Sequence, residues 1–98
     1  MAIATINPYT GETLKIFEPL QKMEIAAKLD LAGKAFQEYR QTSFLERSHW
    51  LEQAATILDQ EKTDLGKLMT LEMGKPLKAA IAEIEKCALV CRYYAENA

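Results

Sequence analysis

The stretch Thr70-Leu71-Glu72-Met73-Gly74-Lys75-Pro76-Leu77 connects two helical patterns and indicates where one helix ends and the next begins. Gly74 can adopt the left-handed backbone conformation that ends many helices, because it has no Cβ. Pro76 suits the first residue of a helix, where its missing N–H would have no intrahelical partner. The stretch therefore predicts two helices joined by a tight connection.

Before this stretch, apolar residues recur at the three- and four-residue spacings of amphipathic helices. A first helix is predicted from about Met23, with a stripe formed by Ile25, Leu29, Ala32, Phe36 and Tyr39. A second helix opens at Ser43, since Ser43 and Glu46 have the spacing of a capping box. Its stripe runs through Arg47, Trp50 or Leu51, Ala54, and Ile57 or Leu58.

Two more helices complete the expected set of about four. Thr63 or Asp64 is expected to start a short third helix that ends at Gly74. The fourth, from Pro76, carries a broad apolar face of Leu77, Ala80, Ile81, Ile84, Cys87 or Ala88, Cys91 and Tyr94. We expect the first three helices to pack against one another, and the fourth to need a covering surface from outside these 98 residues.

The first twenty residues follow a different pattern. Residues 4–6 and 13–17 are short β-prone runs, and the segment between them contains Pro8 and Gly11, which favour a turn. We predict a β-hairpin or arm over residues 1–20 and a helical part over residues 21–98. The predicted fold class is mostly α with an N-terminal β-hairpin, and an isolated hairpin needs a covering layer to be stable.

Composition excludes several functions. The 98 residues carry a net charge of −2 with no basic stripe, so nucleic-acid binding is not expected. The longest purely apolar run, residues 88–91, is far shorter than the roughly 20 residues of a membrane span. The start of the chain lacks the charged and apolar regions of a secretory signal. We therefore expect a cytoplasmic protein that has no contact with membranes.

Two cysteines and one histidine invite a catalytic interpretation. Cys87 and Cys91 share one face of the fourth helix, and we expect both to be buried and unreactive, since apolar surroundings disfavour the thiolate. His49 lies on another helix and is expected to be a half-exposed helical residue. The glycines are scattered and form no phosphate-binding loop. No catalytic or cofactor-binding residue is predicted within this chain.

The chain nevertheless resembles a known family. Residues 6–12, Ile-Asn-Pro-Tyr-Thr-Gly-Glu, together with residues 70–77 and the Cys-Arg-Tyr-Tyr-Ala end of the last helix, are similar to the N-terminal region of NAD(P)-dependent aldehyde dehydrogenases. Within that family they are most similar to the succinate-semialdehyde dehydrogenase branch. The resemblance covers nearly the whole chain, in the family's order.

The resemblance implies a parent oxidoreductase that oxidises a small aldehyde, succinate semialdehyde, to its acid with NAD or NADP. Residues 1–98 would form the N-terminal portion of the cofactor-binding domain in the α/β aldehyde dehydrogenase fold. The family's cysteine nucleophile, glutamate base and glycine turn for the cofactor lie beyond Ala98. The chain alone is therefore expected to be an inactive scaffold that binds no nicotinamide cofactor, and the parent is expected to be a homo-oligomer.

The resemblance also implies a metal site. In the family, the acidic residue that matches Glu72 lies near the backbone just before the Asn-Pro turn, and together they can hold a monovalent cation. Carried over, this gives the Glu72 carboxylate and the Ile6 carbonyl as ligands, with Thr5 as a further candidate. The alternative is that Glu72 simply pairs with Lys75 or with a backbone N–H.

A second function from a different class stays open. The chain could be a free-standing small helical module that binds a protein partner through the apolar face of its last helix. A reading frame that continues past Ala98 would exclude this module.

Overall fold

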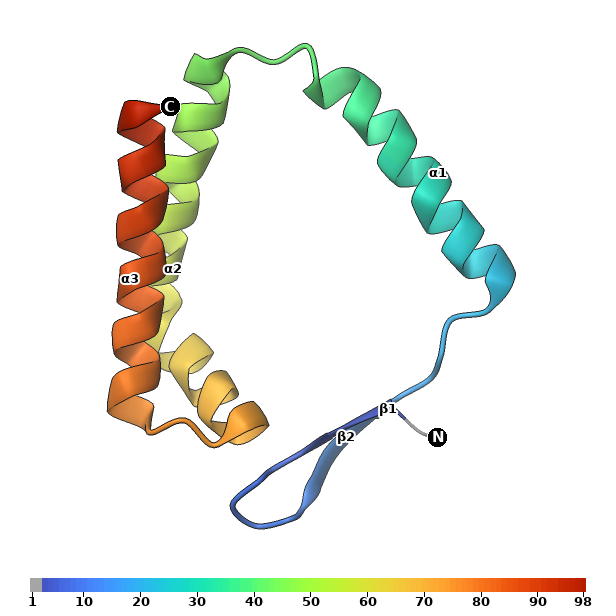
Figure 1. Ribbon diagram of the computed structural model, residues 1–98, viewed down its shortest axis with the longest axis vertical. Coiled ribbons are helices and arrows are strands. Elements are labelled where there is room, and N and C mark those ends of the chain that lie inside the picture. Colours follow the sequence, from blue (N-terminus) through green and yellow to red (C-terminus); the bar gives the residue numbers. More distant parts are fainter. Residues whose placement is uncertain (1–2) are drawn as a thin grey trace.

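The computed structural model describes residues 3–98 as an N-terminal hairpin followed by helices (Figure 1). Strand β1 spans Ile3–Ile6 and β2 spans Thr13–Phe17. Helices α1, α2 and α3 span Lys22–Tyr39, Phe44–Met73 and Leu77–Asn97. Met1 and Ala2, which belong to the predicted arm, lie outside the described residues. The mostly helical fold with an N-terminal hairpin is confirmed.

The two strands pair antiparallel, as predicted. Thr5 pairs with Lys15 and Ile6 with Thr13, so Leu14 is an extra residue in β2 and the ladder bulges there. The turn between the strands is closed by the Gly11 N–H, which donates to the Asn7 carbonyl at 2.8 Å. Gly11 has φ = 76°, a conformation that glycine adopts without strain.

The predicted break at Thr63 or Asp64 is wrong, because α2 continues through both residues. Ser, Thr and Asp favour helix starts but also occur inside helices when their side chains remain in water, and Thr63 and Asp64 are exposed. Gly66 does not break the helix either. It is buried against α3, where a Cβ would lie 2.8 Å from Cγ1 of Ile81. The described residues thus form three helices, not four.

The ends of the helices follow local capping chemistry. Ser43 Oγ accepts from the Glu46 N–H at 3.1 Å, and the Glu46 carboxylate accepts from the Ser43 N–H at 2.8 Å, so the predicted capping box is confirmed. Gly74 ends α2 in the left-handed conformation at φ = 76°. Pro76 differs slightly from prediction: it is the N-cap of α3, and Leu77 is the first helical residue.

The core lies between α2 and α3, which run antiparallel and side by side (Figure 1). The residues buried there are mostly small, which lets the helix backbones approach closely: Ala55, Gly66, Ala80, Ile84, Ala88 and Ala95. Polar contacts join the two helices along their length. Ser48 Oγ donates to the Ala95 carbonyl at 2.5 Å, and Arg92 pairs with Asp59 at 2.6 Å.

Helix α1 lies apart from this pair (Figure 1). It packs against no other described element except through its last turn, where Tyr39 stacks on Trp50 with 5.9 Å between the ring centroids. Its predicted apolar stripe is exposed, with Leu29 at 69% and Phe36 at 56%. The expectation that the first three helices pack together is therefore wrong: α3, and not α1, covers α2.

Within residues 3–98, no helix combines the length and the apolar character that crossing a membrane would require.

Candidate functional site

The predicted metal ligands lie where β1 meets the end of α2. Thr5 Oγ1 donates to the Glu72 carboxylate at 3.4 Å, although the two residues are 67 positions apart in the chain. Both line a cleft of about 690 Å³ between the hairpin and α2, whose other walls are largely apolar: Ile3, Ala4, Leu14, Lys15, Phe17, Leu68 and Leu71. The hairpin thus lies beside Glu72, in keeping with the position that the resemblance to the family implied.

The connection that follows Glu72 also lies close to the Asn-Pro turn. A Cβ on Gly74 would lie 3.0 Å from Cγ of Pro8, so a side chain there would press against the turn that follows β1. The positive φ of Gly74 gives a second reason for glycine at this position. The residue that ends α2 therefore also permits the hairpin to approach.

The electrostatics of this corner suit a cation. Glu72 lies in the last turn of α2, where the helix dipole is negative and disfavours an anion. Lys75 does not compensate it, because its ammonium pairs with Glu83 at 3.0 Å, which disfavours the alternative that Glu72 pairs with Lys75. A carboxylate, a hydroxyl and a backbone carbonyl are oxygen ligands of the kind that hard cations prefer. Ile6 pairs with Thr13 in the hairpin, and the role of its carbonyl as a cation ligand stays a prediction.

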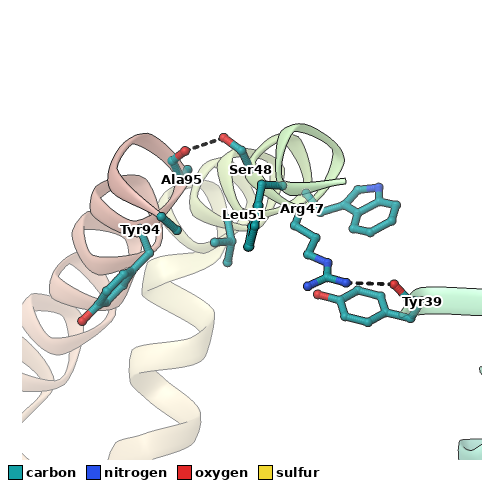
Figure 2. A pocket seen from close by; sticks show the side chains of 9 residues that line it. Tyr39, Arg47, Ser48, Leu51, Tyr94 and Ala95 are labelled. Atoms are coloured by element: carbon teal, nitrogen blue, oxygen red, sulfur yellow. Dashed lines mark hydrogen bonds between the residues drawn. The ribbon is translucent and has the colours of Figure 1, made fainter. Parts of the chain in front are cut away.

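A second cleft, of about 380 Å³, opens between the start of α2 and the end of α3 (Figure 2). Its walls are mainly aromatic and apolar: Tyr39, Phe44, Trp50, Leu51, Tyr94, Ala95 and Ala98, with Arg47 and Ser48 as the polar members. The Ser48 hydroxyl already donates to the Ala95 carbonyl, so it is engaged in holding the helices together. This cleft has the side chains of a packing surface and shows no nucleophile beside a base.

Arg47 holds the connection between α1 and α2, which sequence reasoning did not foresee. Its guanidinium donates to Thr42 Oγ1 at 2.8 Å. It also donates to the Tyr39 carbonyl at 3.0 Å (Figure 2). It also lies over the Tyr39 ring, 4.5 Å from the centroid, and near the Phe44 ring. The signal in the sequence is an arginine one turn into a helix, preceded by a short connection flanked by aromatic residues.

The capping box also affects one titration. The hydrogen bonds that the Glu46 carboxylate accepts from the Ser43 N–H and hydroxyl lower its pKa below the ordinary value of 4.5. The charged form is favoured because an ionised carboxylate is a stronger hydrogen-bond acceptor than a protonated carboxyl group.

The cysteines differ from their prediction. Cys87 is exposed and Cys91 is half-buried, so the expected burial of both is wrong. The face of α3 that packs on α2 carries Ala80, Ile84 and Ala88, and the cysteines lie beside it. His49 is exposed on α2, a different helix from the cysteines, and no group of three or more His, Cys, Asp or Glu side chains among residues 3–98 could hold a metal ion.

Comparison with known proteins identifies the class. The family model of the aldehyde dehydrogenase family matches residues 1–98. The chain therefore belongs to the aldehyde dehydrogenase family, as the motifs at residues 6–12 and 70–77 implied.

Individual relatives are similar along the whole chain. A probable succinate-semialdehyde dehydrogenase [NADP(+)] from Synechocystis sp. is 54% identical over 98 residues, which are 100% of this chain and 22% of that protein. Succinate-semialdehyde dehydrogenase [NADP(+)] 1 from Mycobacterium tuberculosis is 51% identical over 98 residues, again 100% of this chain, and 21% of that protein is covered. The chain thus spans about a fifth of the length of these relatives.

The fold agrees with a solved structure. The succinic semialdehyde dehydrogenase from Streptococcus pyogenes, crystallised in complex with NADP+ as the cofactor, matches with a TM-score of 0.87 and 33% identity. The match covers 95% of this chain and 21% of the other. The open arrangement of hairpin, α1 and the α2–α3 pair is therefore one that a complete enzyme of the family also contains.

Proposed function

We propose that residues 1–98 are the N-terminal part of an NADP-dependent succinate-semialdehyde dehydrogenase, which oxidises succinate semialdehyde to its acid. The observation that carries this proposal is the 54% identity with the Synechocystis relative, which extends over all 98 residues. The similarity in fold to the Streptococcus pyogenes enzyme, whose structure contains NADP+, supports succinate semialdehyde as the substrate and NADP, rather than NAD, as the cofactor.

Within that enzyme, residues 1–98 form the N-terminal portion of the cofactor-binding domain and act as a scaffold. The α2–α3 pair supplies a rigid core of closely packed small residues, and the hairpin lies against the end of α2 through Thr5 and Glu72. The chemistry then belongs to residues outside this segment. The assembled enzyme is expected to be a cytoplasmic homo-oligomer.

A chimera tests the substrate and cofactor. Residues 1–98 replace the matching segment of the Synechocystis relative, and NADPH formation is followed by absorbance with succinate semialdehyde as the substrate. We expect activity close to that of the unaltered relative, with NADP preferred over NAD. A chimera that melts cooperatively but fails to oxidise succinate semialdehyde would contradict the proposal. The 98-residue chain by itself is expected to show no turnover.

The Glu72 corner is the proposed monovalent-cation site of this enzyme, with the Ile6 carbonyl and the Thr5 hydroxyl as partners. A bound cation would offset the unfavourable position of the Glu72 carboxylate at the negative end of α2. The site would stabilise the contact between hairpin and helix. It would contribute no step of the oxidation.

Glu72→Gln tests the cation site in the same chimera. We expect the Tm of the unaltered chimera to rise in potassium or sodium chloride relative to choline chloride at equal ionic strength, and the rise to disappear in Glu72→Gln. Glu61→Gln, which neutralises an exposed carboxylate elsewhere on α2, is the matched control and should keep the cation response. Equal Tm values in all three salts for the unaltered chimera would exclude the site.

A further inference from the structure

The two cysteines of the chain lie together in one surface recess on α3. Cys87 and Cys91 line this recess, of about 450 Å³, with Glu83, Lys86 and Val90. Cys87 is exposed and Cys91 is half-buried, so reagents in solution can reach the pair. Since α3 is an unbroken helix over both positions, the four-residue spacing keeps the thiols on the same face.

The spacing opposes a direct disulfide between them. Side chains at positions i and i+4 of a helix have Cβ atoms about 5–6 Å apart, whereas a disulfide requires about 3.5–4.5 Å. The helix cannot easily distort here, because Ile84 and Ala88, which lie beside the cysteines, are buried against α2. A bridge with one additional atom between the two sulfurs would span the gap without unwinding the helix.

The bridging atom must be one that requires only two protein ligands, the two cysteine sulfurs. Structural zinc sites require four protein ligands, and the described residues provide no group of three or more His, Cys, Asp or Glu side chains around a common point. Soft thiolate sulfur favours soft centres. A trivalent arsenic atom that carries one organic substituent is such a centre, and two As–S bonds complete its coordination.

We propose that Cys87 and Cys91 form a dithiol site for monosubstituted trivalent arsenicals. An arsenical R–As=O reacts with both thiols: two As–S bonds form, the As–O bond breaks, and the two thiol protons leave with the oxygen as one water molecule. Arsenic stays trivalent and both sulfurs keep their oxidation state, so no oxidant or reductant is needed. The site is independent of the aldehyde chemistry.

Phenylarsine oxide and the 98-residue chain test the proposal. The chain contains two cysteines, so thiol titration and intact mass report on this pair alone. We expect one phenylarsenic group per chain, the loss of both titratable thiols, and an adduct that resists excess glutathione but is released by dithiothreitol. Because the second As–S bond forms within one molecule, the affinity should exceed that of either single-cysteine variant by about 100-fold or more.

The matched control keeps two thiols but changes their spacing. In Leu89→Cys/Cys91→Ser, the thiols at 87 and 89 point to different faces of α3, since positions two apart do not face each other. Leu89 is 66% exposed, so the substitution leaves the core intact. This variant should bind arsenic only as weakly as Cys87→Ser and Cys91→Ser. Equal retention by the control, or the loss of only one thiol in the unaltered chain, would overturn the proposal.

Discussion

At the scale of single residues, Gly66 determines how closely α2 and α3 approach. A Cβ there would lie 2.8 Å from Cγ1 of Ile81 and 3.2 Å from its backbone nitrogen. A backbone atom cannot move aside as the end of a flexible side chain can, so any side chain at 66 would force the helices apart. The absence of a side chain is a packing requirement at this position.

Gly66→Val should destabilise the helix pair. Overpacking of this kind typically costs about 1–3 kcal/mol, which exceeds the fraction of a kcal/mol that valine gains over glycine in helix propensity. At roughly 4–8 °C per kcal/mol for a domain of this size, the Tm measured by circular dichroism should fall clearly. Gly33→Ala is the control, because α1 has open space around Gly33; its Tm should stay the same or rise.

The predicted metal ligands show why a site can be only partly predicted from sequence. Thr5 and Glu72 were named from the family's motif, and their 3.4 Å contact joins positions 67 residues apart, which no local pattern indicates. Arg47 was missed because its partners, the Tyr39 carbonyl and the Thr42 hydroxyl, depend on the path of a connection. Local chemistry predicts caps and turns, but it does not predict contacts between distant segments.

At the scale of elements, the capping box gives α2 a pH-dependent start. The pKa of Glu46 is lower in the folded chain than the ordinary value of 4.5. Its contribution to stability is therefore complete above pH 4.5 and is lost as the pH falls through the lower, folded pKa. Glu46→Gln should be less stable than the unaltered chain at pH 7, and the difference in Tm should shrink towards pH 3. A gap that stays constant with pH would contradict this role.

The elements themselves were predictable where local signals decide the structure. The hairpin, the Ser43 start and the Gly74 end follow from turn, capping and left-handed glycine chemistry. The break at Thr63 or Asp64 was wrong because a residue that can start a helix can also continue one. The predicted burial of the cysteines was wrong because the apolar face of α3 is wider than the surface that α2 covers, so the residues at the edges of that face stay accessible.

At the scale of the whole molecule, the chain is flat and open. Its extents are 46 × 40 × 16 Å and its radius of gyration is 17.6 Å, against about 13 Å for a compact domain of 100 residues. Its accessible surface of 8151 Å² likewise exceeds the roughly 5,700 Å² expected of a folded protein of this mass. Large apolar side chains are exposed on every element, including α1 and the hairpin.

This exposed surface should make the isolated chain bind hydrophobic dyes or self-associate. We expect enhanced fluorescence of anilinonaphthalene sulfonate and a sedimentation coefficient that rises with concentration. Leu29→Glu/Phe36→Glu, which places charges on the exposed stripe of α1, should reduce both signals. A chain that stays monomeric at high concentration, melts in one cooperative step and binds no dye would contradict the expectation.

The contact between Thr5 and Glu72 bears on the order in which the elements of the chain fold. Helices α2 and α3 are adjacent in sequence, so bringing them together closes a short loop at little entropic cost. The contact between the hairpin and α2 joins residues 67 positions apart, so it closes a longer loop at a higher entropic cost. We expect α2 and α3 to fold first and the hairpin to join them last. In pulse-labelling hydrogen exchange during refolding, amides of α2 and α3 should gain protection before those of β1 and β2. Simultaneous protection would show that the hairpin takes part in the earliest step.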